Sequence, residues 1–429
     1  MSKVSIFTPT HRPDWIFDAW NSITSQKGDI DWQWVLVPNA GAEIPPAIRD
    51  DPRVKVIPCS FPTPSVGALK SFALQHCDGR IAIELDHDDI LLPYCLREVH
   101  KALKDGGNKF FYAPTIETKT INGKTEDILY NGCGWQHCKW KDHLHNKHEY
   151  NLPWEVNPRT LYNLLAAPNH PRAFTMEAYE KSGGYDPLLA TADDLDLMQR
   201  MYLSGTEFIK HDEPLYWQRM RASDNTQYQF YEGNQQRQRE LGHARIIPMI
   251  HEWCRREGLL KLDLGGALGP KEGFMTVDKR PNSGIQCDIS QGLPFEDNSC
   301  GFIWASDFME HIPHDKIPHV VNEIWRCLKH GGFWYAHTPS VDNPDGTVGR
   351  GAYQDSDHKS FWNRNSHYYW TRQEQNHFSP EIVARFQEVE MQHHFPNDWC
   401  RENRIGYITS LLMAVKPGNE FFGMYGWPR

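Results

Sequence analysis

The chain has 429 residues, and its 45 Lys and Arg against 55 Asp and Glu give a formal net charge of −10 at pH 7. This length predicts two domains, and a content of 39% hydrophobic and 23% charged residues excludes a fibrous or mostly disordered chain. The acidic balance disfavours duplex DNA as a partner, and no apolar run is long enough for a transmembrane segment.

Strand-like and helix-like patterns alternate along the first half of the chain. Short strands are predicted at residues 4–7, 34–37, 54–57 and 81–85, and helices at residues 15–23 and 65–76. This alternation is typical of an α/β domain with a mostly parallel sheet. Residues 115–170 lack a clear period, so we expect them to form loops over a site of this domain.

The alternation starts again after a polar, glutamine-rich stretch at residues 227–240. A helix is predicted at residues 246–254, and strands follow at residues 260–264, 275–278, 302–304 and 333–336. We therefore predict two tandem α/β domains, at residues 1–240 and 241–429.

Three carboxylates, Asp86, Asp88 and Asp89, follow the apolar strand at residues 81–85. Carboxylates at alternating positions can share a hard divalent cation with phosphate oxygens, and ligands of open α/β sheets bind where strands end. The alternative is that Asp88 or Asp89 caps a helix at residues 93–103.

The first half of the chain resembles the family-2 glycosyltransferases, which have a GT-A nucleotide-diphospho-sugar transferase fold. The resemblance covers residues 1–225 and rests on five motifs in the family's order: Val4-Ser5-Ile6 with Pro9-Thr10, Lys70, Asp86-His87-Asp88-Asp89, Gly183-Gly184-Tyr185-Asp186, and Asp193-Asp194-Leu195-Asp196-Leu197. It implies an inverting transfer of a sugar from a nucleotide-sugar donor to an acceptor hydroxyl.

The same resemblance implies roles for individual residues. Asp86 and Asp88 would hold Mn²⁺ or Mg²⁺ against the donor diphosphate, and Asp194 would be the general base, with Asp193 the next candidate. Both residues could instead stabilise the N-terminus of a helix. Donor contacts are implied at Pro9, Asn39, Lys70, Asp86 and Arg221. Asn39 stands where the family usually has an Asp that reads the base, and Arg221 where it has a closing His.

Cysteine and histidine crowd one segment of the first half. Its members are Cys133, His137, Cys138, His143, His145 and His148, and tryptophans flank them. Their spacing matches no standard zinc pattern. There are two hypotheses for the function of this segment: it binds zinc, or it forms a loop that binds the acceptor.

The strand at residues 260–264 ends in a glycine-rich turn, and Asp278 ends the next strand. Such a turn lets a ligand approach the backbone, while an acidic side chain one strand over can hold ribose hydroxyls. The pattern by itself is shared by proteins that bind nicotinamide cofactors and proteins that bind S-adenosylmethionine.

Residues 258–340 resemble the class I S-adenosylmethionine-dependent methyltransferases, which have a Rossmann-like fold. The matching segments are Leu262 to Gly269, Cys287-Asp288-Ile289, Leu293 to Ser299, Phe302 to Ser306, Met309-Glu310-His311-Ile312 and Glu323 to Gly332. The resemblance implies that Asp278 holds the ribose, that Asp288 faces the adenine, and that the methionine part lies at the turn of Asp263, Gly265, Gly266 and Gly269.

Two further polar features belong to this half. Glu310 and His311 are candidates for the methyltransferase site. The alternative is that they cap the start of a helix or make a buried hydrogen bond. His358, in a polar and aromatic insertion after residue 340, is a candidate base because the pKa of histidine lies near neutral, with a plain surface histidine as the alternative.

Together these patterns predict a bifunctional transferase that uses a nucleotide sugar, Mn²⁺ or Mg²⁺, and S-adenosylmethionine. The acceptor would be a glycan or another hydroxyl-bearing molecule, and the methyl group would go to the glycan. Modification of a nucleobase or a protein side chain, or a carbohydrate-binding protein with one inactive domain, are the alternatives. The ten cysteines form no Cys-x-x-Cys motif, which favours reduced thiols and a cytoplasmic location.

Overall fold

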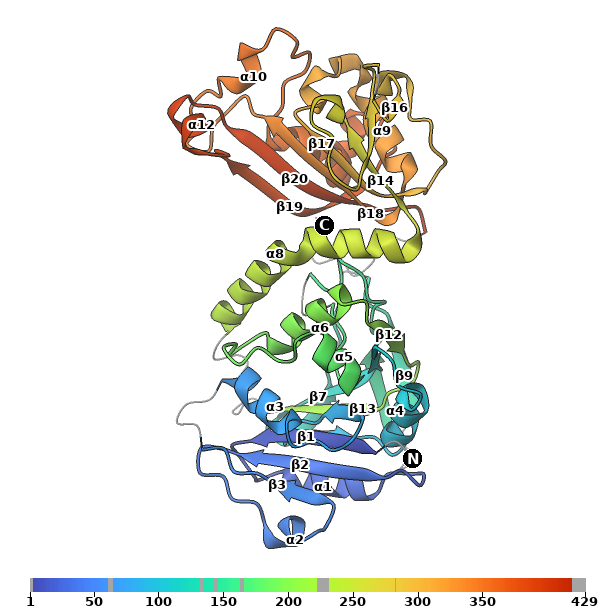
Figure 1. Cartoon of the computed structure of the whole chain (residues 1–429), viewed down its shortest axis with the longest axis vertical. Coiled ribbons are helices and arrows are strands. Elements are labelled where there is room, and N and C mark those ends of the chain that lie inside the picture. Colours follow the sequence, from blue (N-terminus) through green and yellow to red (C-terminus); the bar gives the residue numbers. More distant parts are fainter. Residues whose placement is uncertain are drawn as a thin grey trace. The chain divides into compact units, whose positions relative to one another are not determined.

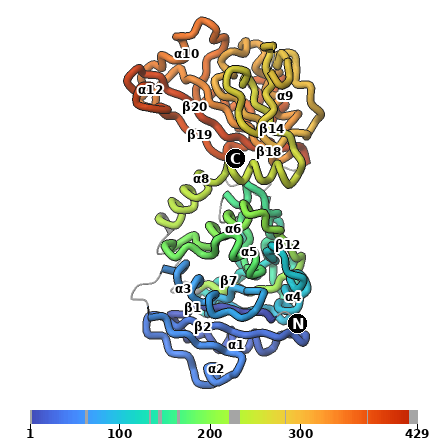
Figure 2. The backbone as a smooth tube through the Cα atoms, viewed as in Figure 1, coloured from blue at the N-terminus to red at the C-terminus, as the bar shows by residue number. Residues whose placement is uncertain are grey.

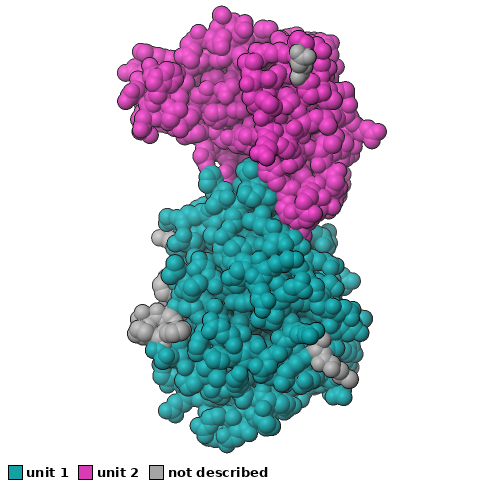
Figure 3. Space-filling view, viewed as in Figure 1, with its two compact units in different colours: residues 1–249 teal, residues 250–429 magenta. Residues whose placement is uncertain are grey.

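A computed structural model describes residues 3–60, 65–131, 134–141, 146–162, 166–221, 231–281 and 283–418, and the remaining residues are grey in Figure 2. The chain divides into two compact units, residues 1–249 and 250–429 (Figure 3). Helix α8 (Tyr231–Glu257) runs across this division and contains the boundary that we predicted after residue 240. Much of the polar stretch at residues 227–240 is therefore helical, because glutamine, arginine and glutamate are good helix formers.

The first unit is built on a seven-stranded sheet with the order β12-β6-β11-β4-β1-β2-β3. Figure 1 labels β1, β2, β3 and β12 of this sheet. Four strands at one side of the sheet run parallel, as the alternating pattern predicts. The next strand, β11, is antiparallel to both of its neighbours. The strands are β1 (Val4–Thr10), β2 (Trp32–Pro38), β3 (Val54–Val56), β4 (Ile81–Glu84), β6 (Lys109–Tyr112), β11 (Ala173–Thr175) and β12 (Glu207–Lys210).

Helices cover the sheet and bring residues to its edge. Helix α3 begins after Ser65, whose hydroxyl accepts a hydrogen bond from the N–H of Ala68. Helix α4 follows Tyr94 and has no side-chain cap, which excludes the alternative in which Asp88 or Asp89 caps this helix. The helices are α1 (Ile16–Thr24), α2 (Pro46–Arg49), α3 (Val66–Leu74), α4 (Cys95–Leu103), α5 (Met176–Lys181) and α6 (Asp193–Leu203).

The expectation that residues 115–170 form only loops is wrong. They hold strands β7 (Thr115–Ile121), β8 (Lys124–Asp127), β9 (His137–Lys141) and β10 (Lys147–Asn151). β7 and β8 belong to a four-stranded sheet with β5 (Ile90–Leu91) and β13 (Tyr216–Arg221), and β9 pairs with β10. Polar residues on the buried part of β7 hide its period. The turn between β7 and β8 is Asn122-Gly123 with φ values of 51° and 77°, the favoured sequence for a two-residue hairpin turn.

The second unit has its own seven-stranded sheet, with the order β16-β15-β14-β17-β18-β20-β19. The first five strands in this order are parallel, and β20 is antiparallel to both of its neighbours. From β14 the chain adds β15 and β16 on one side of that strand, and it then crosses over to place β17 on the other side. This reversal of strand order is the switch point where open α/β sheets bind ligands. The strands are β14 (Leu260–Leu264), β15 (Met275–Asp278), β16 (Ile285–Gln286), β17 (Cys300–Ser306), β18 (Leu328–Pro339), β19 (Phe386–His394) and β20 (Tyr407–Ala414).

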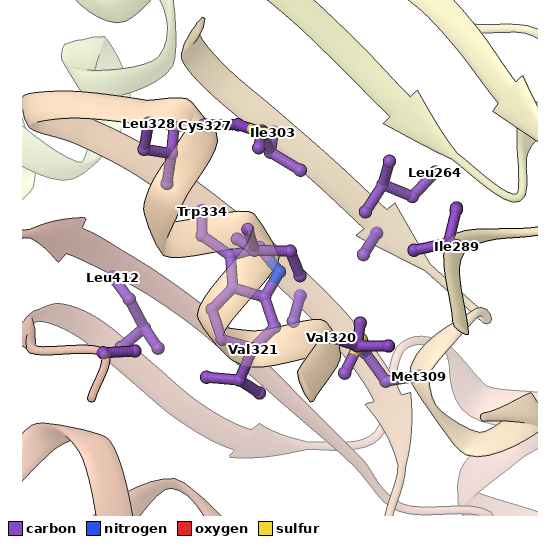
Figure 4. Close-up of a cluster of buried hydrophobic side chains, with 14 of the residues drawn as sticks. Leu264, Ile289, Ile303, Met309, Val320, Val321, Cys327, Leu328, Trp334 and Leu412 are labelled. Atoms are coloured by element: carbon purple, nitrogen blue, oxygen red, sulfur yellow. The ribbon is translucent and has the colours of Figure 1, made fainter. Parts of the chain in front are cut away.

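The core of the second unit lies between this sheet and α9 (Ile317–Cys327). The helix presents Val320 and Val321 to the sheet, where Trp334 is fully buried (Figure 4). Burial of each such side chain contributes about 1.5–3 kcal/mol. Short helices complete the unit: α10 (Gly351–Gln354), α11 (Tyr368–Thr371), α12 (Asp398–Glu402), η1 (Gly266–Leu268), η2 (Ile289–Gln291), η3 (Met309–His311), η4 (His314–Lys316), η5 (Arg364–His367) and η6 (Gln373–Phe378). Each unit thus has the mixed α/β fold that the sequence predicts.

Within the part of the chain that the structure describes, no helix combines the length and the apolar character needed to cross a membrane. The nine cysteines in that part are all free thiols.

Candidate functional sites

A pocket of about 390 Å³ lies in the first unit where β1, β2 and β4 end. Its wall contains eight candidate residues from the sequence analysis, and they come from distant segments: Pro9, Asn39, Lys70, Asp86, Asp88, Asp89, Asp193 and Asp194. The backbone of Arg221 ends β13, but its side chain lies outside the described residues. Asn39 donates a hydrogen bond from its amide to the carbonyl of Thr10, at 3.0 Å.

A network of buried charges forms one wall of this pocket. Glu84, the last residue of β4, is its centre: one carboxylate oxygen lies 2.6 Å from Lys70 Nζ, and the other lies 3.0 Å from Arg172 Nε. Lys70 also contacts Asp193 at 2.7 Å, and Arg172 contacts Asp194. Charges buried this deeply are tolerated only when they are paired, so the network holds both aspartates of α6 in place.

The two aspartates at the start of α6 differ in charge environment. Burial acts to raise the pKa of Asp194, but Arg172 and Lys70 outweigh this effect, so the pKa is lowered. Burial raises the pKa of Asp193, and the opposing effect of Lys70 is smaller. Asp194 is thus held ionised at the pocket wall, where it can accept a proton. Both residues also lie in the first turn of α6, where carboxylates are favourable, so the predicted stabilisation of a helix N-terminus fits their position.

The acidic turn after β4 has three aspartates at the pocket, and one of them, Asp89, also has a structural role. Asp89 is buried and accepts hydrogen bonds from the Tyr216 hydroxyl and the Arg219 N–H, each at 2.9 Å. The Tyr216 hydroxyl in turn accepts the N–H of Asp86 at 3.1 Å, which fixes the turn. Asp86 and Asp88 line the pocket, and burial together with the nearby Asp86 raises the pKa of Asp88. Two oxygen donors with excess negative charge fit a hard divalent cation.

Sequence reasoning missed three residues of this site: Glu84, His170 and Arg172. His170 Nε2 lies 2.7 Å from the Arg172 guanidinium and 3.7 Å from an oxygen of Asp86. Glu84, Asp86 and His170 offer ligand atoms within 4.8 Å of one another. A charged residue inside the apolar strand Ile81-Ala82-Ile83-Glu84 was the available signal, because a buried carboxylate needs a partner.

The Cys/His-rich segment is only partly described, since Cys133, His143 and His145 lie outside the described residues. His137 Nε2 lies 3.0 Å from the Tyr130 carbonyl, and His148 Nδ1 lies 3.0 Å from Asp127. The described members of this segment form no group of three metal-ligating side chains.

In the second unit, the glycine-rich turn follows β14 and lies beside the end of β15. Gly265 has a φ of +81°, and a Cβ on Gly266 would lie 2.0 Å from a carboxylate oxygen of Asp263. A Cβ on Gly269 would meet no atom within 4 Å, so the turn is open there. Asp278 accepts a hydrogen bond from the Ala267 N–H at 3.4 Å and therefore lies against the turn. A close backbone turn beside a carboxylate fits the cofactor that the sequence implies.

Two of the remaining predicted residues, Asp288 and Glu310, follow the ends of strands, and His358 lies in the insertion after β18. Asp288 caps η2 and accepts hydrogen bonds from the N–H and the hydroxyl of Ser290, at 3.1 and 2.7 Å. Glu310 lies in η3 with 2% of its surface exposed, and burial raises its pKa to about 8. One of its carboxylate oxygens has no hydrogen-bond partner, so this oxygen makes neither the cap nor the buried hydrogen bond considered above. His358 Nδ1 lies 2.9 Å from the Ala352 carbonyl.

Comparisons with known proteins give different results for the two units. Residues 271–336 match the family model of a methyltransferase domain, within the stretch where the sequence resembles the methyltransferases. No curated protein matches the chain.

Among solved structures, the chain is similar to S. aureus TarS. The structure of TarS residues 1–349 has 16% identity and a TM-score of 0.39, over 54% of this chain and 62% of that one. The same fragment in complex with UDP-GlcNAc has the same identity and TM-score, and the match covers 54% of this chain and 64% of that one. The match to the longer TarS structure covers 38% of that chain. The chain thus spans less than two thirds of each of these solved chains. The family match shows that the second unit contains a methyltransferase domain.

Proposed function

We propose that the first unit transfers a sugar from a nucleotide-sugar donor to an acceptor hydroxyl, and that the second unit methylates the resulting glycan. The observation that carries the first activity is one pocket in which Asp86, Asp88 and Asp194 lie with the cations Lys70 and Arg172. This arrangement supports charge neutralisation and proton transfer in the same place.

The residues of the first pocket support a single displacement. Asp86 and Asp88 would hold Mn²⁺ or Mg²⁺, which would neutralise the charge that develops on the diphosphate leaving group. Asp194 would accept the proton of the acceptor hydroxyl while its oxygen attacks the anomeric carbon and the bond to the diphosphate breaks. Attack from the face opposite the leaving group inverts the configuration. Pro9, Asn39 and Lys70 would contact the donor.

A panel of nucleotide sugars, each with Mn²⁺ or Mg²⁺, tests this proposal by thermal unfolding. At a concentration of 100 times Kd a ligand stabilises by about 2.7 kcal/mol, which shifts the Tm of a unit of this size by several degrees. We expect one donor to raise the Tm with metal and to lose the effect in EDTA. If no donor in the panel raises the Tm, the proposal for the first unit is contradicted.

The methyl transfer rests on the family match together with the glycine turn beside Asp278. Asp278 would accept hydrogen bonds from the ribose hydroxyls of S-adenosylmethionine, and Asp288 would face the adenine. The turn from Asp263 to Gly269 would hold the methionine part. The acceptor oxygen would attack the methyl carbon as its bond to sulfur breaks, with His358 the candidate base on the acceptor side.

Asp278→Ala is expected to weaken S-adenosylmethionine binding tenfold or more in calorimetry on the full chain. A hydrogen bond to a charged group contributes about 1.5–3 kcal/mol, and about 1.4 kcal/mol corresponds to a factor of ten. Asp315→Ala, a change at an exposed aspartate of the same unit, is the matched control. Binding of NAD by the wild-type chain without a response to S-adenosylmethionine would overturn the methyltransferase proposal.

The location is part of the same proposal. Nucleotide sugars and S-adenosylmethionine are cytosolic metabolites, and the nine described free thiols agree with a cytoplasmic enzyme.

A further inference from the structure

Three metal-ligating side chains of the second unit come together outside the glycine turn. Glu310 and His311 belong to η3, and His358 follows α10. Each offers a ligand atom, and the three atoms lie within 4.8 Å of one another. We call Glu310, His311 and His358 the triad.

The triad lies at the edge of the sheet where the glycine turn lies. Helix η3 directly follows β17, which is parallel to β14 and paired with it. Phe308, the residue before η3, packs on the turn so closely that a Cβ on Gly265 would lie 2.6 Å from its ring. A group bound by the triad would therefore be close to a cofactor bound at the turn.

The burial of the Glu310 carboxylate is only partly compensated, by a hydrogen bond from its own backbone N–H. Glu310 is 2% exposed, and its Oε2 has no hydrogen bond. The charged groups that act on it are the carboxylates of Asp307 and Asp355, which add negative charge. Buried carboxylates are normally paired with a cation or with donors, so an unpartnered oxygen at this position points to a bound positive group.

Both histidines have a backbone carbonyl beside the same ring nitrogen. His358 Nδ1 lies 2.9 Å from the Ala352 carbonyl, and His311 Nδ1 lies 3.3 Å from the Asp357 carbonyl. A carbonyl only accepts, so each Nδ1 is the donor, and Nε2 is the nitrogen that a neutral imidazole in this orientation offers to a metal ion. Nε2 of His358 lies 4.0 Å from Asp355, beyond hydrogen-bond distance. Metal-ligating histidines are typically oriented in this way by a carbonyl or carboxylate on the other nitrogen.

We propose that the triad binds one divalent cation on the acceptor side of the methyl-donor site. One carboxylate and two imidazoles form a ligand set found in catalytic zinc sites, and these sites leave a position open for water or substrate. The same set also suits other divalent transition metals. This inference rests on the proposed methyl transfer and identifies what holds the acceptor.

The open positions of the cation would take oxygen atoms of the acceptor. A bound hydroxyl loses its proton to solvent more readily, because the cation stabilises the alkoxide. The oxygen then attacks the methyl carbon, and the carbon–sulfur bond breaks to give S-adenosylhomocysteine. In this arrangement His358 is a ligand and not the base.

The surrounding segment favours a saccharide with neighbouring hydroxyls as the acceptor. Tyr353 and Phe361 are 57% and 52% exposed, and their ring centroids are 5.1 Å apart. Exposed aromatic faces can pack on the apolar face of a flat or sugar-like ring. Two neighbouring hydroxyls could occupy two open positions of one cation.

Equilibrium dialysis of the full chain against Zn²⁺, followed by metal analysis, tests the site. We expect Glu310→Gln and His358→Gln each to lose one equivalent of zinc that the wild-type chain retains. The affinity for Zn²⁺ should fall by more than the roughly 10–100-fold that is typical when a residue hydrogen-bonded to a metal ligand is removed. Two controls should keep this equivalent: His314→Gln, at an exposed histidine of the same unit, and Asp88→Ala, which reports the other pocket separately.

Binding of S-adenosylmethionine shows whether each variant is folded. Methyl transfer measured with and without a chelator separates the proposed methyl transfer from the proposed cation site. Zinc content that is unchanged in both variants overturns the metal site. If His358→Gln abolishes methylation but keeps the zinc, His358 is the base and the triad is wrong. If zinc binds but S-adenosylmethionine does not, the methyl-transfer proposal fails while the cation site remains.

Discussion

Asp194→Asn is expected to lower the turnover of sugar transfer by roughly 10²–10⁴-fold while the affinity for the donor survives. Asparagine has the same size and can still accept a hydrogen bond from Arg172, the partner of Asp194 in the buried network. It cannot take the proton of the acceptor hydroxyl. Steady-state turnover, together with donor binding by calorimetry, separates the chemical step from binding.

Asp193→Asn is the matched control because Asp193 precedes Asp194 and is paired with Lys70. We expect a smaller loss of turnover for this variant. The pKa of Asp194 is lowered below the usual 3.8, so its basic form is present above that pH and is lost only as the pH falls through the lowered value. An acidic limb of the rate profile near pH 6, or near-normal turnover in Asp194→Asn, would assign the base to another group.

Asp88→Ala is expected to abolish metal-dependent sugar transfer and to leave S-adenosylmethionine binding unchanged. The substitution removes one of two carboxylates that would hold the cation, and a cation stabilises the developing charge by several kcal/mol. Since about 1.36 kcal/mol corresponds to a factor of ten in rate, a loss of several hundredfold or more follows. Transfer rates measured over a titration of Mn²⁺ or Mg²⁺ test this result.

The fold of the acidic turn should survive this change. Asp89, not Asp88, accepts the side-chain and backbone hydrogen bonds from Tyr216 and Arg219. Thermal unfolding should therefore show little change in Asp88→Ala. Full transfer activity in this variant at saturating metal would remove Asp88 from the proposed site.

Local patterns in the sequence were sufficient to predict the two α/β folds. β1, β4, β14 and β15 are short segments rich in apolar and β-branched residues, and their length and spacing distinguish them from the intervening helices. The carboxyl ends of parallel strands meet at one edge, so Asp86 after β4 and Asp278 at the end of β15 could be placed at candidate sites from the sequence alone.

The same local reasoning failed where a strand carries polar residues on its buried face. β7 begins with Thr115 and contains the buried Glu117, so alternation of apolar and polar residues was absent. The sequence does contain a hairpin signal, Asn122-Gly123, but the strands on either side of it lack the apolar period that predicts a strand. Burial raises the pKa of Glu117 to about 7, with hydrogen bonds from Tyr130, Asn151 and Asn169 opposing the shift, so polar contacts and not apolar periodicity support this strand.

The sequence by itself determined the parallel strands β1, β2, β3, β4, β14 and β15, the glycine turn and the acidic residues at strand ends, because these follow from interactions between near neighbours in the chain. Only the tertiary structure decided which charges become partners. Lys70 and Asp193 are 123 residues apart in sequence, and Arg172 lies 88 residues from Glu84. The triad likewise joins η3 to a distant insertion. Such contacts depend on strand order and on the burial that forces charges to pair, and neither property is encoded in local spacing.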